Sequence, residues 1–184
     1  VEPALMAQFP LVEDCARALG MVTWPMVAFE ADDALATAVA RFAADPAVEQ
    51  VILCSPDKDL SQLLAAHDEQ YDFAKGVRWG ADGVKARHGV HAHQIADYLA
   101  LTGDAVDNIP GISGIGAKSA AVLLAHFGSL DSLLARIDEV PFLRLRGAAG
   151  MATRLREQRE HALLWRQLTT IPLDVPLPDG DFAR

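Results

Sequence analysis

Acidic residues gather in three short clusters along the sequence. Their members are Glu30, Asp32 and Asp33 in FEADDALA, Asp57 and Asp59 in SPDKDL, and Asp104 and Asp107 in TGDAVDNIPG. Carboxylates held close together repel one another unless cations lie among them. Hard divalent ions such as Mg²⁺ or Mn²⁺ prefer oxygen ligands of this kind. If the fold brings the clusters together, the sequence predicts a divalent-metal site.

The second cluster follows a segment that is typical of a buried parallel strand. Residues Val48–Cys54 (VEQVILC) are rich in apolar and β-branched side chains. Asp57 and Asp59 then lie beyond its C-terminal end, where open α/β sheets place ligands. In an extended segment these two carboxylates point the same way and Lys58 points the other way. Cys54 is expected to be a buried free thiol within the strand.

The other two clusters have a simpler interpretation beside the metal site. Glu30, Asp32 and Asp33 begin an Ala-rich helical segment, where acidic side chains cap the helix and suit its dipole without any metal. Asp104 and Asp107 are three residues apart, so they share one face if that turn is helical. A solvated turn is the alternative for any one cluster taken alone.

Periodicity divides the chain into an α/β part and a helical part. The expected elements are helices at Leu11–Leu19 (closed by Gly20), Ala31–Ala44 and Leu60–Ala66, the strand Val48–Cys54, and a hairpin of Tyr71–Phe73 with Val77–Trp79. After His93 the pattern is helical throughout. We expect a boundary near Gly89.

A glycine-punctuated segment, NIPGISGIGAKSAA (residues 108–121), precedes the helical periodicity that begins at Ala117. It differs from a P-loop because Ala117 separates Gly116 from Lys118 and no strand comes before it, so ATP binding is not expected. A glycine turn at a helix start lets backbone N–H groups approach a phosphate. An ordinary tight interhelical turn is the alternative.

Composition is that of a globular chain, with 184 residues of which 51% are hydrophobic. No apolar run reaches the ~20 residues needed to cross a bilayer, and the expected compartment is the cytoplasm. The net charge of -9 is unusual for a protein that binds DNA. The last third is nevertheless basic, although its arginines could equally form a solvated helix face with partners such as Glu157 and Glu160. They are Arg136, Arg144, Arg146, Arg154, Arg156, Arg159 and Arg166.

The motifs EADD, PDKDL and LTGDAVDNIPGISGIGAKSA, in this order, resemble the 5′ nuclease family. This family includes the 5′-3′ exonuclease domain of bacterial DNA polymerase I, its free-standing relatives and the flap endonucleases. The resemblance covers residues 10–176. It implies a two-metal, structure-specific hydrolysis of DNA at flaps, nicks or 5′ ends. It also assigns Glu30, Asp32 and Asp33 to one ion and Asp57, Asp59, Asp104 and Asp107 to the other.

The resemblance also implies a helix-hairpin-helix that contacts DNA phosphates without reading bases. The implied DNA-binding positions are Gly111, Gly114, Ile115, Gly116, Ala117, Lys118 and Ser119. In the family this hairpin holds a monovalent cation, usually K⁺, through main-chain carbonyls. The matching positions are Leu101, Thr102, Pro110, Ile112 and Ile115.

The chain departs from the family pattern at its start, because nothing before Val1 supplies the family's first strand or its helical arch with phosphate-clamping Arg and Lys. We therefore expect a C-terminal portion of a longer protein, inactive alone, with a missing N-terminal segment or a polymerase domain of the same protein as partner. The expected architecture is a remnant of a PIN-like parallel-sheet domain (residues 1–90) followed by an all-helical helix-3-turn-helix domain (91–184). A DNA-binding module without turnover and a magnesium-dependent phosphatase are the alternatives.

Overall fold

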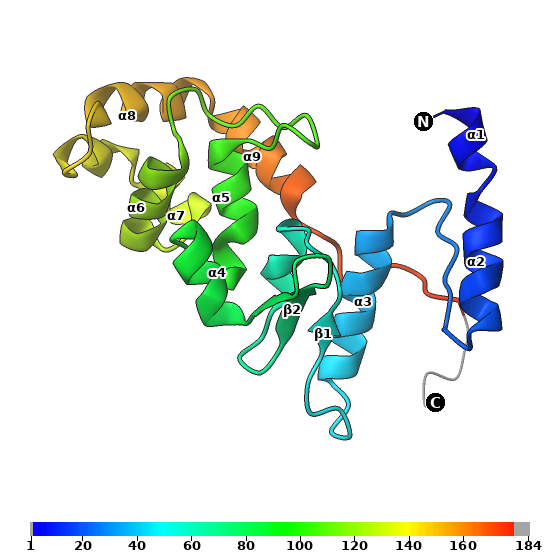
Figure 1. Cartoon of the computed structure of the whole chain (residues 1–184). Helices are drawn as coiled ribbons and strands as arrows, with labels where there is room; N and C mark the ends of the chain where they lie inside the picture. The colour runs from blue at the N-terminus through cyan, green and yellow to red at the C-terminus, as the bar shows by residue number, and fades with distance from the viewer. Residues whose placement is uncertain (1, 179–184) are drawn as a thin grey trace. The chain divides into compact units, whose positions relative to one another are not determined.

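A small sheet with helices before and after it in the sequence makes up the computed structural model of this α/β protein, which describes residues 2–178 (Figure 1). The chain divides into two units. One unit combines residues 1–41 with residues 172–184, and the other runs continuously from residue 42 to residue 171. No described helix has both the length and the apolar character needed to cross a membrane.

The first unit is helical. Its elements are α1 (Pro3–Met6), α2 (Phe9–Ala18) and α3 (Ala31–Ala43), of which α3 continues two residues into the second unit. The predicted helices at Leu11–Leu19 and Ala31–Ala44 therefore exist, and Gly20 follows α2 with a φ of +80°. Neither α1 nor α2 buries a residue. Residues 36–39 of α3 are all buried, and Thr37 Oγ1 among them accepts a hydrogen bond from Val175 N–H at 3.1 Å.

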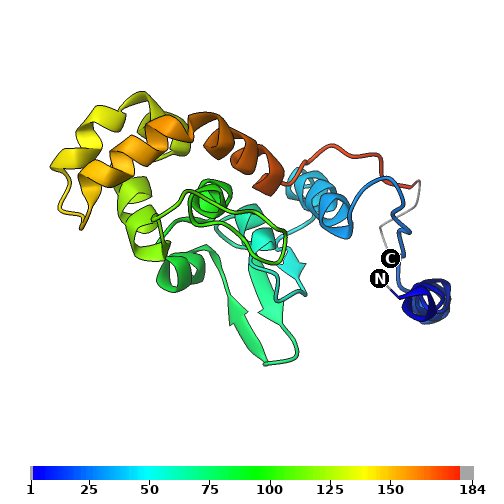
Figure 2. The same cartoon turned by 90° about the horizontal axis from the view of Figure 1, so that it is seen from above.

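The sheet lies in the second unit. Its strands are β1 (Ile52–Leu53), β2 (Glu69–Asp72) and β3 (Val77–Trp79), in the order β1-β2-β3. Strand β1 runs parallel to β2, as predicted, and β2 and β3 form the antiparallel hairpin visible in Figure 2.

The predicted strand Val48–Cys54 is only two residues long. The side chain of Asp68 accepts the Val51 N–H at 3.0 Å, so a carboxylate takes this backbone donor, while Val51 O still accepts the Glu69 N–H at 3.0 Å. Cys54 comes directly after β1 and is exposed, so the expectation of a buried thiol is wrong.

The hairpin begins two residues earlier than predicted, at Glu69 instead of Tyr71. Its turn is closed by Asp72, whose carboxylate accepts the Lys75 N–H at 3.1 Å and contacts Lys75 Nζ at 2.9 Å. Because Asp72 is used in this way, Phe73 lies outside the strand and is exposed.

Helices dominate the second unit after the sheet, as predicted. They are α4 (Ala81–His88), η2 (Ala92–Gln94), α5 (Ile95–Thr102), α6 (Ala117–Phe127), α7 (Leu130–Ala135), η3 (Ile137–Phe142), α8 (Ala148–Glu157) and α9 (Arg159–Thr169). A further helix, η1 (Asp59–Leu63), lies between β1 and β2. The predicted helix Leu60–Ala66 is the 3-10 helix η1. Helix α5 packs against α6 and α9 (Figure 1), and fully buried leucines such as Leu99, Leu123 and Leu155 form the core.

Candidate metal centre

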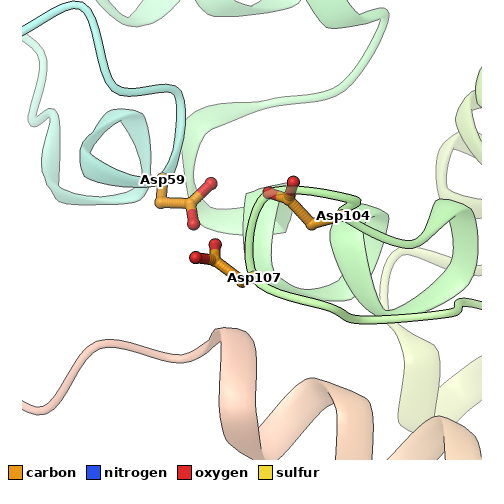
Figure 3. A group of neighbouring side chains, drawn as sticks. All are labelled: Asp59, Asp104 and Asp107. Atoms are coloured by element: carbon orange, nitrogen blue, oxygen red, sulfur yellow. The ribbon is translucent and has the colours of Figure 1, made fainter. Parts of the chain in front are cut away.

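Three carboxylates from two distant segments face one another in the second unit (Figure 3). Asp59 begins η1, whereas Asp104 and Asp107 belong to the loop between α5 and α6. One oxygen from each lies within 4.8 Å of the others. We call these residues the acidic trio. The trio joins two of the three clusters that the sequence predicts to share metal ions.

The loop that carries Asp104 and Asp107 closes on itself and is not helical. Asp104 and Ile109 exchange backbone hydrogen bonds of 2.7 and 2.8 Å, and Ile112 N–H donates to Leu101 O at 2.8 Å. Gly111 has a φ of +68°, and a Cβ there would lie 2.5 Å from the Thr102 carbonyl carbon. Only glycine fits this close backbone approach.

The segment that carries Asp57 and Asp59 turns into η1 instead of remaining extended. Asp57 Oδ1 accepts the Asp59 N–H at 3.1 Å, so this carboxylate forms an Asx turn beside the trio. The side-chain amide of Gln70 fixes this segment. Its Nε2 donates to Ser55 O at 2.9 Å and to Asp57 O, and its Oε1 accepts a hydrogen bond from Ser61 Oγ at 2.6 Å. Gln70 lies on the central strand β2 and is fully buried.

The electrostatics of the trio differ from one carboxylate to the next. Burial raises the pKa of Asp59 to about 6, with Asp57, Asp104 and Asp107 adding to the shift and Lys58 opposing it. Burial also disfavours ionisation of Asp104. There the contact with Lys58 and backbone hydrogen bonds from Val106 and Asp107 outweigh burial, and the pKa lies below its ordinary value.

Two oxygens of the trio test whether a divalent ion fits. Among residues 2–178, Asp59 Oδ1 is a buried oxygen without a hydrogen-bond partner, and the buried Asp104 Oδ2 is paired with the Lys58 ammonium group. Buried polar atoms in proteins are normally hydrogen-bonded, and an ion is one explanation of the exceptions. Carboxylate oxygens are the donors that Mg²⁺ and Mn²⁺ prefer. The acidic trio is therefore chemically suited to a divalent ion.

The remaining predicted acids lie in the first unit, at the start of α3. Asp33 Oδ2 accepts the Glu30 N–H at 3.0 Å, and Ala34 N–H donates to Glu30 O. This is the helix-capping arrangement that the sequence offers as the simpler interpretation. Asp32 and Asp33 are partly buried and Glu30 is exposed. Their convergence with the acidic trio stays a prediction.

The predicted DNA-binding segment forms a tight turn that leads into α6. Gly116 precedes the helix without a side-chain cap, so the first N–H groups of α6, at Ala117, Lys118 and Ser119, have no acceptor within the helix. The Ile115 N–H donates to Ile112 O at 2.9 Å and is engaged inside the turn. Lys118 is exposed.

Arg154 of α8 packs on this turn. A Cβ at Gly114, whose φ is +76°, would lie 2.7 Å from Arg154 Nη2. Other arginines of the basic segment form ion pairs, but with acids different from those predicted: Arg136 pairs with Glu139, Arg156 with Asp138 and Arg166 with Asp131. These pairs account for part of the basic segment without nucleic acid.

Sequence reasoning missed Lys58, Gln70 and Arg154 as parts of these sites. Lys58 stands between two predicted ligands, and its position inside the motif was a usable signal. Gln70 and Arg154 meet their partners through contacts between separate segments. A single sequence carries no local pattern for such contacts.

Two family models match the chain, one over each half. The model of the 5′-3′ exonuclease N-terminal resolvase-like domain matches residues 1–89, and that of the 5′-3′ exonuclease C-terminal SAM fold matches residues 90–181.

Similar proteins include DNA polymerase I of Pseudomonas aeruginosa, which is 44% identical over 88% of this chain and 18% of its own length. Flap endonuclease Xni of Yersinia enterocolitica is 35% identical over 94% of this chain and 65% of its own length. A solved structure of the bacteriophage T5 D15 flap endonuclease with DNA and metal ions is 25% identical. It covers 92% of this chain and 61% of its own, with a TM-score of 0.73. The chain thus spans about a fifth of the polymerase and less than two thirds of the other two proteins.

Proposed function

Because the chain belongs to the 5′-3′ exonuclease family, we propose that it is part of a metal-dependent, structure-specific 5′-3′ exonuclease or flap endonuclease that hydrolyses DNA phosphodiester bonds. The observation that carries the proposal is the acidic trio, which gathers oxygen ligands from two separate segments. The named relatives include a flap endonuclease, and the related bacteriophage protein is seen with DNA and metal ions.

The acids have separate proposed roles. Asp59, Asp104 and Asp107, with Asp57 beside them, hold one Mg²⁺ or Mn²⁺ ion, and the EADD acids Glu30, Asp32 and Asp33 hold a second. Such a pair of ions, when bound, activates a water and stabilises the leaving 3′ oxygen. The side chains themselves position oxygens and need not transfer protons. Gln70 supports this role because it fixes the segment that presents Asp59.

The turn before α6 is the proposed DNA contact. The N–H groups of Gly116, Ala117, Lys118 and Ser119 face a phosphate, while Gly111, Gly114 and Ile115 shape the approach. Carbonyls of Leu101, Thr102, Pro110, Ile112 and Ile115 hold a K⁺ ion in this proposal. Thr102 and Pro110 line the same surface hollow, which supports their proximity.

The proposed substrate is DNA with 5′ flaps, nicks or ends. A polymerase domain or a further N-terminal segment of the same protein is a proposed partner, since the matched polymerase is far longer than this chain. The proposed domains are residues 1–90, the C-terminal part of a PIN-like nuclease domain, and residues 91–184, a helix-hairpin-helix DNA-binding domain that also supplies Asp104 and Asp107 to the acidic trio. The cytoplasm is the proposed compartment, because bacterial enzymes that process DNA work there.

Cleavage of labelled DNA by the full-length protein tests this function. We expect a 5′-flap substrate to be cut with Mg²⁺, to remain intact with EDTA, and to remain intact when Asp59 is replaced by Asn. DNA binding without cleavage would establish a binding module instead. Hydrolysis of a small phosphate ester with intact DNA would establish a phosphatase.

A further inference from the structure

Lys58 places a positive charge on the oxygens that a metal ion would need. Its Nζ forms an ion pair with Asp104 Oδ2 and lies 3.6 Å from Asp59 Oδ1. Both oxygens are buried, and within residues 2–178 Asp59 Oδ1 has no hydrogen bond of its own. The ammonium group therefore contacts the acidic trio directly, through Asp59 and Asp104.

The need for this charge follows from burial. The Asp104 side chain is only 4% exposed, and an ionised carboxylate so deeply buried is unfavourable without a cation beside it. Three neighbouring carboxylates add mutual repulsion. Although burial alone would lower the pKa of Lys58, its contacts with Asp104 and Asp59 raise it, so Lys58 remains charged.

The Lys58 side chain is also able to move away from these carboxylates. It is 37% exposed, and lysine carries its charge on a flexible four-carbon stem. A divalent ion bound to Asp59 and Asp104 would repel an ammonium group on the same oxygens. The two cations therefore compete for one position.

We propose that Lys58 is a displaceable internal cation, which neutralises the acidic trio in the metal-free protein and moves aside when a divalent ion binds. The inference rests on the proposed function, because it takes Asp59 and Asp104 as metal ligands. Lys58 thereby sets metal affinity: it stabilises the empty site and weakens binding of the ion that replaces it.

The test compares Lys58→Met with a matched control, Lys75→Met, in the same chain. Lys75 also pairs with a buried aspartate, Asp72, at 2.9 Å, but at the hairpin turn away from the trio. Both substitutions remove one positive charge. Mg²⁺ affinity is measured by calorimetry, and melting temperature is measured in EDTA and in saturating Mg²⁺.

Lys58→Met is expected to bind Mg²⁺ about 5- to 150-fold more tightly than the unaltered chain, the range typical of coupled sites. Its melting temperature should fall in EDTA and recover with Mg²⁺. Lys75→Met should lower the melting temperature equally in both conditions and leave Mg²⁺ affinity unchanged. If Lys58→Met does not fold in EDTA, Lys58→Arg keeps the charge and should show no gain in Mg²⁺ affinity.

Unchanged or weaker Mg²⁺ binding by Lys58→Met overturns the proposal, as does an equal gain in Lys75→Met or a gain in Lys58→Arg. Absence of Mg²⁺ binding by the unaltered chain is a different result. It would reject the metal site and the role of Lys58 with it. If the unaltered chain binds Mg²⁺ and Lys58→Met binds it equally well, only the role of Lys58 is rejected.

Discussion

Replacing Asp59 by Asn should stabilise the metal-free protein while weakening its metal site. The Asp59 side chain is 15% exposed and faces two further carboxylates. In this position its negative charge is unfavourable, as its raised pKa indicates. Asn keeps the shape of the side chain and removes the charge.

The magnitude follows from the pKa. A value of about 6 in place of 3.8 corresponds to about 3 kcal/mol of destabilisation by the ionised group. Residual solvent contact screens part of this electrostatic destabilisation, so we expect Asp59→Asn to raise the free energy of unfolding by about 1–2 kcal/mol. For a chain of this size that gain raises the melting temperature by roughly 2–8 °C. Mg²⁺ binding should weaken by at least about tenfold, since even loss of an outer-shell partner costs that much.

The stability of the metal-free protein should decrease with rising pH in the range where Asp59 titrates. Between about pH 4 and pH 6 the folded protein retains a proton on Asp59 that the unfolded chain has released. Stability of the metal-free protein therefore decreases as pH rises through this window and stays at the lower level above it. Asp59→Asn lacks this decrease. The difference between the two proteins should be small near pH 4 and reach its full value above pH 6.

Urea unfolding in EDTA at several pH values measures this difference, and calorimetry measures Mg²⁺ binding. Asp174→Asn, which changes an exposed aspartate near the end of the described chain, is the control and should alter neither property. The reasoning is refuted if Asp59→Asn is no more stable than the unaltered protein at pH 8. It is equally refuted if the difference is already complete at pH 4.

Four further outcomes are expected. Mg²⁺ affinity should fall about tenfold per pH unit below pH 6, because Asp59 must lose its proton to bind the ion. Equal calorimetric affinities at pH 5 and pH 7.5 would contradict this dependence on Asp59. Gly114→Ala should cost about 1–2 kcal/mol in urea unfolding, owing to its positive φ and the Arg154 contact. Gly116 has a φ of -94° and open space around it, so Gly116→Ala should keep full stability and weaken DNA binding measured by fluorescence anisotropy. Equal destabilisation by Gly114→Ala and Gly116→Ala would contradict the difference between the two positions. Gln70→Leu should cost about 1–3 kcal/mol through unsatisfied partners and weaken Mg²⁺ binding, and unaltered Mg²⁺ affinity would show that the segment holds its shape without the amide.

Sequence reasoning succeeded where one segment carries its own information. A β-branched segment followed by two aspartates predicted carboxylates after a parallel strand, and Asp59 lies there. Ala-rich periodicity after the EADD motif predicted α3 to within one residue. The helical second part was equally visible in its periodicity.

The failures occurred where side chains replace backbone partners. Asp68 takes the Val51 N–H and shortens β1, and Asp57 takes the Asp59 N–H and turns the chain into η1. That turn reverses the expected direction of Lys58, which was predicted to point away from the acids and instead contacts them. Such local competition between side chain and backbone has no periodicity, so an alternating pattern cannot reveal it.

The buried amide of Gln70 has a consequence for the entropy of ion binding. Fixing the backbone of a flexible segment costs about 1–2 kcal/mol per residue, and residues 55–61 would bear this cost if an ion had to order them. Gln70 orders them during folding, because it lies on β2, which pairs with β1 on one side and β3 on the other. The ion then meets a segment that is already in place, with only the Lys58 side chain left to move. Metal affinity should therefore depend on the integrity of this small sheet, even though none of its strands supplies a member of the acidic trio.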